Sequence, residues 1–329
     1  MAHSFVIGVD LGGTNIVTGA ISEDGTVRLP VRTGLTNAKR GADTVADTIA
    51  EMVEASIADV QRELKIPRTH ILGVGLGSPG PLDRAKGIVV VTPNLGWTNY
   101  PLRGKIEERV HLPASLDNDA NCATLGEWWL GAGRGTKNLV GLTIGTAIGG
   151  GLILNGELYH GSTDAAGEIG HTTIETQGRR CNCGNYGCLE AYASGPAIAE
   201  RAREALAHED SSRLRAMVDG DLSRITAQIV YSAAAEEDAL ALEIVRETAR
   251  FLGTGVANLL NIFNPEMVVL AGGVTQAGDR LFEPLRAEVR RRAFRPAWEA
   301  VRIVPGELAG TAGVIGAAAT FLQQRRATL

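Results

Sequence analysis

One histidine and three cysteines lie close together near the middle of the chain and could bind a metal. His171 is followed by Cys181, Cys183 and Cys188. One imidazole and three thiolates form a closed tetrahedral ligand set, which is typical of structural zinc. Because such a set leaves no position for a water molecule, the pattern favours a structural Zn²⁺ over a catalytic one.

Glycines and acidic residues around this cluster support the zinc interpretation. Gly184 and Gly187 permit the tight turns that closely spaced ligands need. Free buried thiols beside a core histidine are one alternative, and a nucleic-acid zinc knuckle is another. Glu168, Glu175 and Glu190 surround the cluster, and carboxylates would repel phosphates, so the second alternative is disfavoured.

Two glycine-rich segments are candidates for phosphate binding. DLGGTN (10–15) places a carboxylate after an apolar run and two glycines in a turn. Backbone N–H groups at glycines can approach phosphate oxygens, and Asp10 could hold Mg²⁺, usually through water. The alternative is an ordinary hairpin turn that begins with Asp. IGTAIGGG (144–151) repeats the pattern, and AGGV (271–274) could leave room for a base or ribose. Together, the three segments favour a nucleotide site.

Two other nucleotide motifs do not fit. A Walker loop needs a lysine in a fixed glycine frame, and neither Lys105 nor Lys137 lies in one. GLGSPG (75–80) matches the dinucleotide-binding pattern, but Pro81 follows directly and an apolar run soon after leaves no space for a helix. The sequence therefore disfavours a Rossmann site.

A third polar cluster could do proton chemistry. PASLDNDAN (113–121) ends a predicted strand with Asp117, Asn118 and Asp119 before a helix. A carboxylate there could accept the proton of a substrate hydroxyl, while Asn118 orients that hydroxyl or its neighbour. The alternative is a helix N-cap, for which Asp and Asn are preferred, and one of the two aspartates is expected only to cap.

The elements that must position these residues form an α/β pattern. In the first half, apolar runs and helical spacing predict strands 5–9, 16–21, 27–33, 71–76 and 114–116 and helices 40–65, 102–110 and 120–130. In the second half they predict strands 267–270 and 301–304 and helices 238–261, 281–291 and 312–323. The segment that begins at Val6 aligns with the one that begins at Val140, which suggests an internal duplication.

Composition sets the broad class. The 329 residues are 44% hydrophobic with a net charge of −5, which predicts two globular domains and disfavours a nucleic-acid partner. The apolar stretch 139–154 is glycine-rich and too short for a bilayer, and the start lacks a signal-peptide pattern. We therefore expect no membrane association and a cytoplasmic location. Cys122 is expected to be a core residue.

Six motifs in chain order resemble the ROK family of bacterial sugar kinases and sugar-responsive repressors: DLGGTN, GLGSPGPLD, DNDAN, GTAIGGG, GEIGH and CNCGNYGCLE. The resemblance covers residues 5–320 and is closest to the glucokinases of the family. It implies an actin-like ATPase fold, built from two duplicated ribonuclease-H-like α/β domains with the active site in a cleft between them. We place the small N-terminal domain at 1–117 and the larger one at 118–329, with an inserted zinc-binding loop at 171–188. The C-terminal helix, 312–325, could pack on the first domain.

The resemblance also assigns roles to individual residues. Asp119 resembles the catalytic base, and Asn94, Asn118, Asp119, Glu168, His171 and Glu190 match the sugar contacts. His171 would use one ring nitrogen for zinc and the other for sugar. The Mg²⁺–ATP phosphate region matches Asp10, Gly12, Gly13, Thr14, Gly145 and Thr146, and the adenosine side matches Gly272 and Gly273. Ala147 departs from the pattern, because the family more often has glycine there, and its methyl could crowd a phosphate.

The implied activity is ATP-dependent phosphorylation of the 6-hydroxyl of glucose, with Asp119 as general base. N-acetylmannosamine, N-acetylglucosamine, mannose and fructose remain alternative substrates, and polyphosphate remains an alternative donor. A non-catalytic sugar sensor is the rival class. The repressors of the family carry an N-terminal helix-turn-helix, for which a strand at Phe5 leaves no room, so a kinase is preferred. A homodimer or homotetramer is expected.

Overall fold

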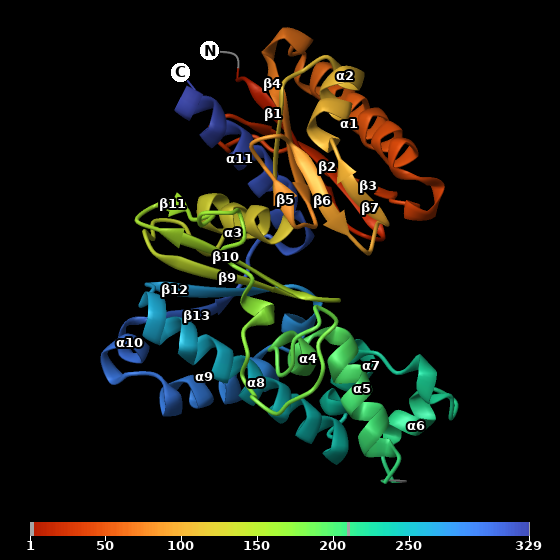
Figure 1. Ribbon diagram of the computed structural model, residues 1–329, viewed down its shortest axis with the longest axis vertical. Helices are drawn as coiled ribbons and strands as arrows, with labels where there is room; N and C mark the ends of the chain where they lie inside the picture. The colour runs from red at the N-terminus through yellow and green to blue at the C-terminus, as the bar shows by residue number, and fades with distance from the viewer. Residues whose placement is uncertain (1–2, 209–210, 329) are drawn as a thin grey trace. The chain divides into compact units, whose positions relative to one another are not determined.

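The computed structural model describes residues 3–208 and 211–328, which divide into two compact units (Figure 1). Unit 1 comprises Met1–Lys137, Gly151–Gly167 and Glu307–Leu329, and unit 2 comprises Asn138–Gly150 and Glu168–Gly306. The first unit thus extends beyond the expected boundary at residue 117 and includes two later segments.

The described chain contains both strands and helices, as the sequence predicted. The strands are β1 (Phe5–Leu11), β2 (Asn15–Ser22), β3 (Arg32–Leu35), β4 (Ile71–Ser78), β5 (Leu82–Asp83), β6 (Ile88–Thr92), β7 (Trp97–Tyr100), β8 (Ala114–Asn118), β9 (Leu139–Ile144), β10 (Ile148–Leu154), β11 (Glu157–Leu158), β12 (Met267–Ala271) and β13 (Arg302–Pro305). The helices are α1 (Ala42–Leu64), α2 (Leu102–Val110), α3 (Asp119–Leu130), α4 (Glu190–Ala193), α5 (Gly195–Leu206), α6 (Arg213–Met217), α7 (Ala227–Ala235), α8 (Ala239–Phe263), α9 (Asp279–Arg292), α10 (Arg295–Ala300) and α11 (Ala312–Thr328).

The two main sheets are built on the same plan, which confirms the duplication expected from the sequence. The first sheet has the order β3-β2-β1-β4-β8 and the second has the order β11-β10-β9-β12-β13. In the first sheet β4 runs parallel to both β1 and β8, and in the second β12 runs parallel to both β9 and β13. Since β1 and β9 occupy equivalent positions, the glycine-rich turns that follow them are equivalent as well.

One predicted strand was placed wrongly. The pattern predicted a strand at 27–33, whereas β3 spans Arg32–Leu35 and the earlier part contributes only an isolated bridge between Ile21 and Arg28. Pro30 lies between the two, and a proline has no N–H to donate to a neighbouring strand.

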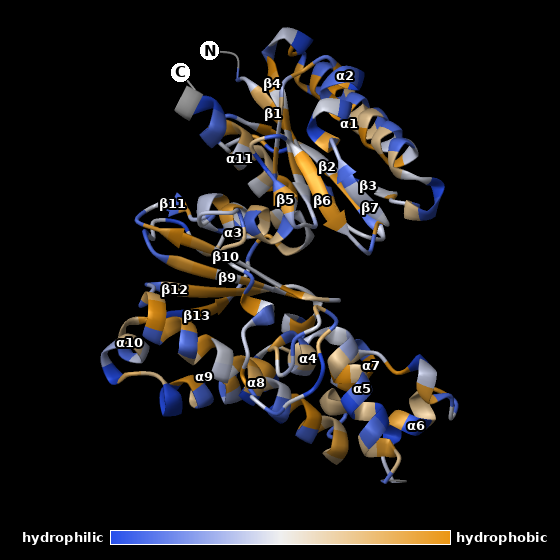
Figure 2. Ribbon diagram, in the orientation of Figure 1, coloured by the Kyte–Doolittle hydropathy of each residue, from blue (hydrophilic) through white to orange (hydrophobic). Residues whose placement is uncertain are grey.

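The two faces of β1 pack against different helices, because alternate side chains of a strand point to opposite faces. Phe5, Ile7 and Val9 join the core that contains α1 and α2, and Val6 joins the core around α11. Figure 2 shows the central strands as mainly hydrophobic, whereas α1 carries polar residues on its outer side. A Cβ at Gly8 would lie 2.0 Å from the carbonyl oxygen of Val314, so α11 can approach β1 only over a glycine.

Helix α3 belongs to unit 1 because it packs closely along α11. A Cβ at Gly126 would lie 2.2 Å from the carbonyl oxygen of Ala312, and one at Gly316 would lie 1.5 Å from the carbonyl oxygen of Cys122. This glycine-mediated contact explains why the first unit does not end at residue 117. It also places the C-terminal helix on the first unit.

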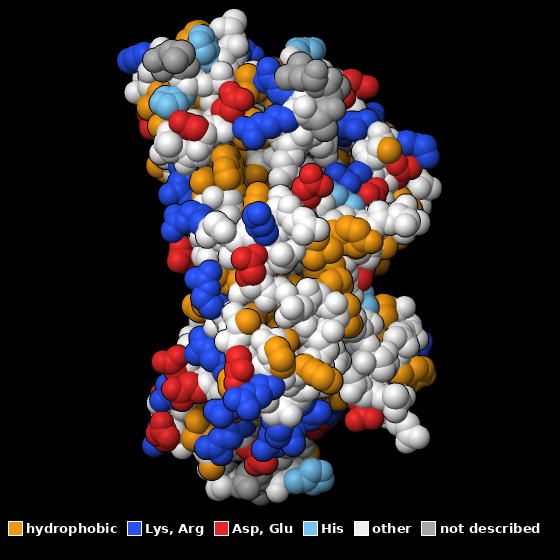
Figure 3. All heavy atoms as spheres, turned by 90° about the vertical axis from the view of Figure 1, so that its left-hand side faces the viewer, with side chains coloured by type: hydrophobic (Ala, Val, Ile, Leu, Met, Phe, Trp, Pro, Cys, Tyr) orange, Lys and Arg blue, Asp and Glu red, His pale blue; other side chains and the backbone are white. Residues whose placement is uncertain are grey.

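Charged side chains of both signs are interspersed on the face of the molecule in Figure 3. On α9, for example, Glu288 pairs with Arg291 at 2.7 Å and also with Arg292. Among the helices that the structure describes, none has the length and apolar composition to cross a bilayer.

Candidate active site

Two predicted acidic residues come together in unit 1. Asp10 lies near the end of β1, and Asp119 is the first residue of α3. Burial raises the pKa of Asp10 to about 7, and the negative charge of Asp119 adds to this effect. A divalent cation would relieve both costs, because it compensates the charges that burial and repulsion disfavour. The donor set therefore fits the Mg²⁺ expected at Asp10.

The start of α11 also lies against Asp10. A Cβ at Gly313 would lie 2.3 Å from Oδ2 of Asp10. Only a glycine therefore leaves space for the carboxylate at this point. This neighbour was missed by sequence reasoning, because Gly313 is distant in the chain and belongs to no motif.

The N-cap of α3 is Asn118 rather than an aspartate. Its Oδ1 accepts hydrogen bonds from the N–H groups of Ala120 at 2.9 Å and Asn121 at 3.2 Å. The expectation that one aspartate only caps the helix was therefore wrong. Because Oδ1 is used within the protein, a substrate contact of Asn118 would use its amide nitrogen.

The neighbouring Asp117 is completely buried in a polar network. Its Oδ2 lies 2.8 Å from Nε2 of His160 and 3.1 Å from Nε of Arg84. Its Oδ1 accepts a hydrogen bond from Nδ2 of Asn121 at 3.2 Å. Buried carboxylates need such partners to offset the loss of hydration. Sequence reasoning missed His160 and Arg84, because neither belongs to a motif of recognisable spacing.

The first glycine-rich turn follows Asp10 directly. The N–H of Gly12 donates to the carbonyl of Asn15 at 2.9 Å, and Oγ1 of Thr36 donates to the carbonyl of Gly12 at 2.7 Å. Gly13 and Thr14 are exposed. Asn94 lies beside the turn, because a Cβ at Gly13 would lie 3.5 Å from its Cβ. Unit 1 thus brings together Asp10, the glycine turn, Asn94, Asn118 and Asp119.

Unit 2 contains a pocket of about 810 Å³ at the second glycine-rich turn. We call residues 145–148 of this turn the phosphate turn. Gly145, Thr146 and Gly273 line the pocket, as expected for a nucleotide site. Gly272 has a different role: it has φ +98°, and a Cβ there would lie 2.3 Å from the carbonyl oxygen of Ile144. This glycine permits close packing of the strand ends rather than clearing space for a base.

Most of the pocket wall comes from helices that the motifs did not indicate. Residues of α5, α7 and the segments beside them contribute Gly195, Pro196, Ala199, Arg203, Ile225, Thr226, Ala227, Gln228, Tyr231, Ser232 and Ala235. The hydroxyl of Tyr231 is buried, and no residue in the described part of the chain forms a hydrogen bond with it. Thr226 caps α7 through its side chain, and this cap is a sequence signal that could have located the helix.

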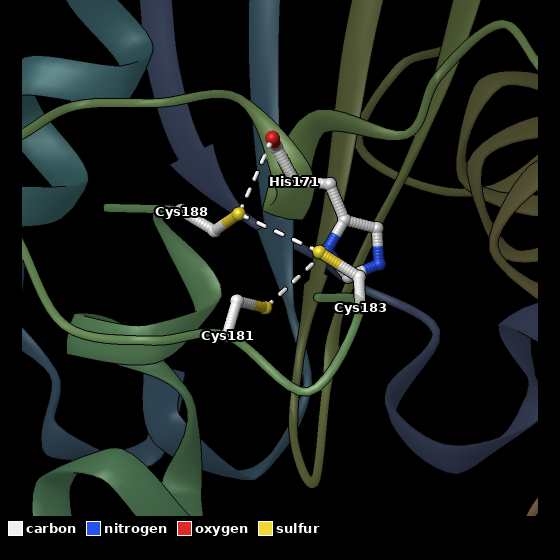
Figure 4. A group of neighbouring side chains, drawn as sticks. All are labelled: His171, Cys181, Cys183 and Cys188. Carbon is white, nitrogen blue, oxygen red and sulfur yellow. Dashed lines mark hydrogen bonds between the residues drawn. The ribbon is translucent and has the colours of Figure 1, made fainter. Parts of the chain in front are cut away.

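The four predicted zinc ligands converge in unit 2 (Figure 4). Their ligand atoms all lie within 4.8 Å of one another. The Sγ atoms of Cys183 and Cys188 are 3.7 Å apart, as are Sγ of Cys181 and Nδ1 of His171. Ligands bound tetrahedrally at about 2.0–2.3 Å are separated by roughly 3.5–3.8 Å. The four residues therefore fit a structural Zn²⁺.

Two glycines shape the loop that carries the cysteines. Gly184 and Gly187 have φ values of +95° and +71°, a region in which side chains cause strain. A Cβ at Gly187 would also lie 1.6 Å from the carbonyl oxygen of Glu175. The chain can therefore turn sharply between Cys183 and Cys188 only with glycine at these positions.

The predicted sugar contacts of unit 2 lie around the four ligands. Nε2 of His171 is 4.0 Å from Oε2 of Glu168, while Nδ1 of the same ring faces Cys181. Oε1 of Glu190 lies 3.8 Å from Sγ of Cys181. Since the two ring nitrogens face different groups, His171 could bind a metal through one and a ligand through the other, as the sequence suggested.

Comparison with known proteins shows similarity to one family over nearly the whole chain. A family model described as "ROK family" matches residues 6–324. A glucokinase of Halalkalibacterium halodurans is 37% identical over 98% of this chain and 97% of its own. A solved ROK family glucokinase from Streptomyces griseus, in complex with glucose and AMPPNP, is 34% identical with a TM-score of 0.81 over 96% of this chain and 98% of that one. A xylose repressor of Caldicellulosiruptor bescii is 34% identical over 96% of this chain and 78% of the repressor.

These similarities agree with the two main sheets of the structure. The chain has the actin-like ATPase fold, with two ribonuclease-H-like sheets of equivalent strand order. The expected fold class is confirmed.

Proposed function

This chain belongs to the ROK family, and from that premise we propose that it is an ATP-dependent glucokinase, which transfers the γ-phosphoryl group of ATP to the 6-hydroxyl of glucose. The pair formed by Asp119 and Asp10 in unit 1 carries the proposal, because phosphoryl transfer to an alcohol requires a proton acceptor next to a cation ligand. The relatives named glucokinase support glucose as the acceptor.

Asp119 accepts the proton of the 6-hydroxyl as its oxygen attacks the γ-phosphorus in line. Its place at the first turn of α3 fixes the carboxylate on a rigid element. We assign the sugar hydroxyls to Asn94, Asn118, Glu168, His171 and Glu190. Positioning of the reacting oxygen is the main contribution of these residues.

Asp10 holds the Mg²⁺ that accompanies ATP, and the cation offsets negative charge on the phosphates. Backbone N–H groups at Gly13 and Thr14 and at Thr146 in the phosphate turn bind the phosphate oxygens, whereas the N–H groups of Gly12 and Gly145 close the two turns. Gly273 lines the pocket in unit 2, and we assign it to the adenosine side.

The pocket in unit 2 favours a nucleotide over polyphosphate as the donor. Its wall is largely apolar, and its two cationic side chains are Arg203 and Arg280, of which Arg280 pairs with Glu237 at 3.1 Å. A polyanion would need a denser positive lining, whereas a base needs apolar surface and a few polar groups, such as the buried hydroxyl of Tyr231.

Structural zinc at His171, Cys181, Cys183 and Cys188 completes the sugar site in this proposal. When bound, the metal would fix the ring of His171 through one nitrogen and leave the other for the sugar. The spacing of the four ligand atoms supports this assignment.

We also propose that the protein is a cytoplasmic homodimer or homotetramer. Among the described residues its four cysteines form no disulfide, as expected in a reducing compartment. Ile262 and Phe294 are 70% and 77% exposed, and the N–H of Phe294 donates to Oδ1 of Asn261, so the two apolar side chains lie in one region of unit 2. Exposed apolar side chains of this size are common at subunit interfaces. Light scattering would measure the state.

A coupled assay of ADP release with a panel of sugars tests the activity. Glucose should give the highest kcat/KM, above N-acetylmannosamine, N-acetylglucosamine, mannose and fructose, and ATP should exceed polyphosphate as donor. The variant Asp119→Asn should bind glucose normally and lose at least roughly 10²- to 10⁴-fold in kcat. Glucose binding without any turnover by the wild-type protein would instead identify a sugar sensor.

A further inference from the structure

Glu190 contacts two parts of unit 2 that the motifs treated as separate. It is the first residue of α4, directly after the cysteine-rich loop. Its Oε1 lies 3.8 Å from Sγ of Cys181, and its Oε2 accepts a hydrogen bond from the N–H of Ile148 at 2.9 Å. Ile148 is the last residue of the phosphate turn and the first of β10. One carboxylate therefore contacts both the phosphate turn and the cysteine-rich loop (171–188), which we call the metal-binding loop.

Two further contacts hold the same turn, and both come from residues that flank the cysteine-rich loop in the sequence. The N–H of Gly195, at the start of α5, donates to the carbonyl of Gly145 at 2.8 Å. A Cβ at Gly170 would lie 2.1 Å from the carbonyl oxygen of Ile148, so the residue before His171 packs directly on the turn. Within the turn, the N–H of Gly145 donates to the carbonyl of Ala147 at 2.9 Å.

The hydrogen bond from Ile148 to Glu190 is the charged member of this set. Ile148 is only 2% exposed, and a buried N–H without an acceptor is costly. A carboxylate acceptor gives a stronger bond than a neutral one and holds the peptide in a fixed orientation. Since Thr146 and Gly145 line the nucleotide pocket, the orientation of this peptide sets the direction of the groups that face the donor.

We infer that Glu190 is a positioning residue for the phosphate turn, so that the metal-binding loop determines affinity for the phosphoryl donor as well as for the sugar. The inference rests on the proposed function only in naming the donor as a nucleotide. It adds to the sugar contact already assigned to Glu190, which uses the same side chain but predicts no effect on the donor.

The test compares two glutamates that are both assigned to the sugar. Glu168 lies in the same unit, and its side chain is 56% exposed beside His171. Binding of a non-hydrolysable ATP analogue with Mg²⁺ is measured without sugar, by calorimetry, for the wild type, Glu190→Ala and Glu168→Ala. We expect the dissociation constant to rise about tenfold in Glu190→Ala and to stay within about twofold in Glu168→Ala. Equal analogue affinity in all three proteins would overturn the inference.

A conservative variant separates positioning from loss of folding. Glu190→Gln keeps a side-chain oxygen that can accept the hydrogen bond from Ile148 but loses the charge. We expect its analogue affinity to lie within about threefold of the wild type while its glucose affinity falls. An analogue affinity as weak as that of Glu190→Ala would show that the acceptor is not what matters and would contradict the inference.

Amide hydrogen exchange at Ile148 provides a readout that needs no ligand. In Glu190→Ala this amide should exchange at least about tenfold faster than in the wild type, because its acceptor is gone. Unchanged exchange would refute the positioning role. If the wild-type protein failed to bind the analogue, the proposed function and the donor part of the inference would both fail, while exchange at Ile148 would still decide whether Glu190 holds the turn.

Discussion

Nε2 of His160 lies 2.8 Å from Oδ2 of Asp117, whose side chain is completely buried two residues before Asp119. His160 follows β11, whereas Asp117 lies in β8. The contact therefore anchors a distant segment of unit 1 to the strand that ends at the proposed catalytic base. Arg84 contacts the same carboxylate and also pairs with Asp164 at 3.2 Å. The segment that carries His160 and Asp164 is therefore linked to Asp117 both directly and through Arg84.

Replacing His160 should weaken this anchor. We expect His160→Ala to lower the free energy of unfolding by about 1.5–3 kcal/mol, because a buried carboxylate loses one hydrogen-bond partner, and to lower kcat through the misplaced Asp119. Urea denaturation and steady-state kinetics measure the two effects. His111→Asn is the control: His111 is exposed with φ +52°, which Asn tolerates, and this variant should change stability by less than about 0.5 kcal/mol. Equal stability of the two variants would contradict the anchor.

The pKa of Asp10 makes stability depend on pH. Burial first, and the charge of Asp119 second, raise the pKa from 3.8 to about 7 in the folded protein. Between these values the unfolded chain has released a proton that the folded chain still holds, so this group costs stability as pH rises through the window. Without Mg²⁺, the stability advantage of Asp10→Asn over the wild type should grow from pH 4 to 7 and then level off.

Mg²⁺ supplies the control for this prediction. The cation should stabilise the wild type at pH 8, as a rise in Tm, and should have much less effect on Asp10→Asn. If the difference between the two proteins were constant from pH 4 to 8, Asp10 would not titrate as described.

The metal-binding loop predicts different results for two cysteine variants. Cys183→Ser removes a ligand and should lose zinc together with much of the glucose affinity, because a structural zinc contributes roughly 10–16 kcal/mol in small sites. Cys122→Ala removes a buried thiol outside the cluster and should keep its zinc. Metal content is measured by atomic absorption, and glucose affinity by calorimetry. Active wild-type protein without zinc would exclude the assignment.

The departure at Ala147 should have little effect. The residue is exposed, its φ is not positive, and its carbonyl accepts the hydrogen bond from Gly145. We therefore expect Ala147→Gly to leave the KM for ATP within about twofold and to lower stability by about 0.4–1 kcal/mol, through the greater freedom of the unfolded chain. A fall of tenfold or more in KM would show that the methyl group crowds the phosphate.

The sequence predicted most elements of the fold, because their signals are local. Helix α2 spans Leu102–Val110 as its apolar spacing indicated, and β4 and α8 differ from the prediction by a few residues at their ends. The strand at 27–33 was misplaced because strand pairing depends on a partner that lies elsewhere in the chain, and Pro30 interrupts the run.

The metal ligands could also be predicted from the sequence, because they are closely spaced. His171 and the three cysteines lie within one short segment whose glycines allow it to fold back on itself, so residue type and spacing were enough to predict the cluster. The motif residues Asp10, Asp119, Gly145 and Thr146 were identified from another local signal, because each lies at or just after the end of a recognisable strand.

Only the tertiary structure decided how these residues are held. Helix α11 is far from Asp10 in the chain, yet Gly313 lies against its carboxylate; His160 supports Asp117; and Glu190 accepts a hydrogen bond from Ile148. Each of these contacts joins residues that are distant in sequence, through packing that no local pattern encodes. The sequence by itself determined which groups could do the chemistry, because chemistry depends on residue type. Packing decided which neighbours fix their orientation and charge, because these depend on distance in space.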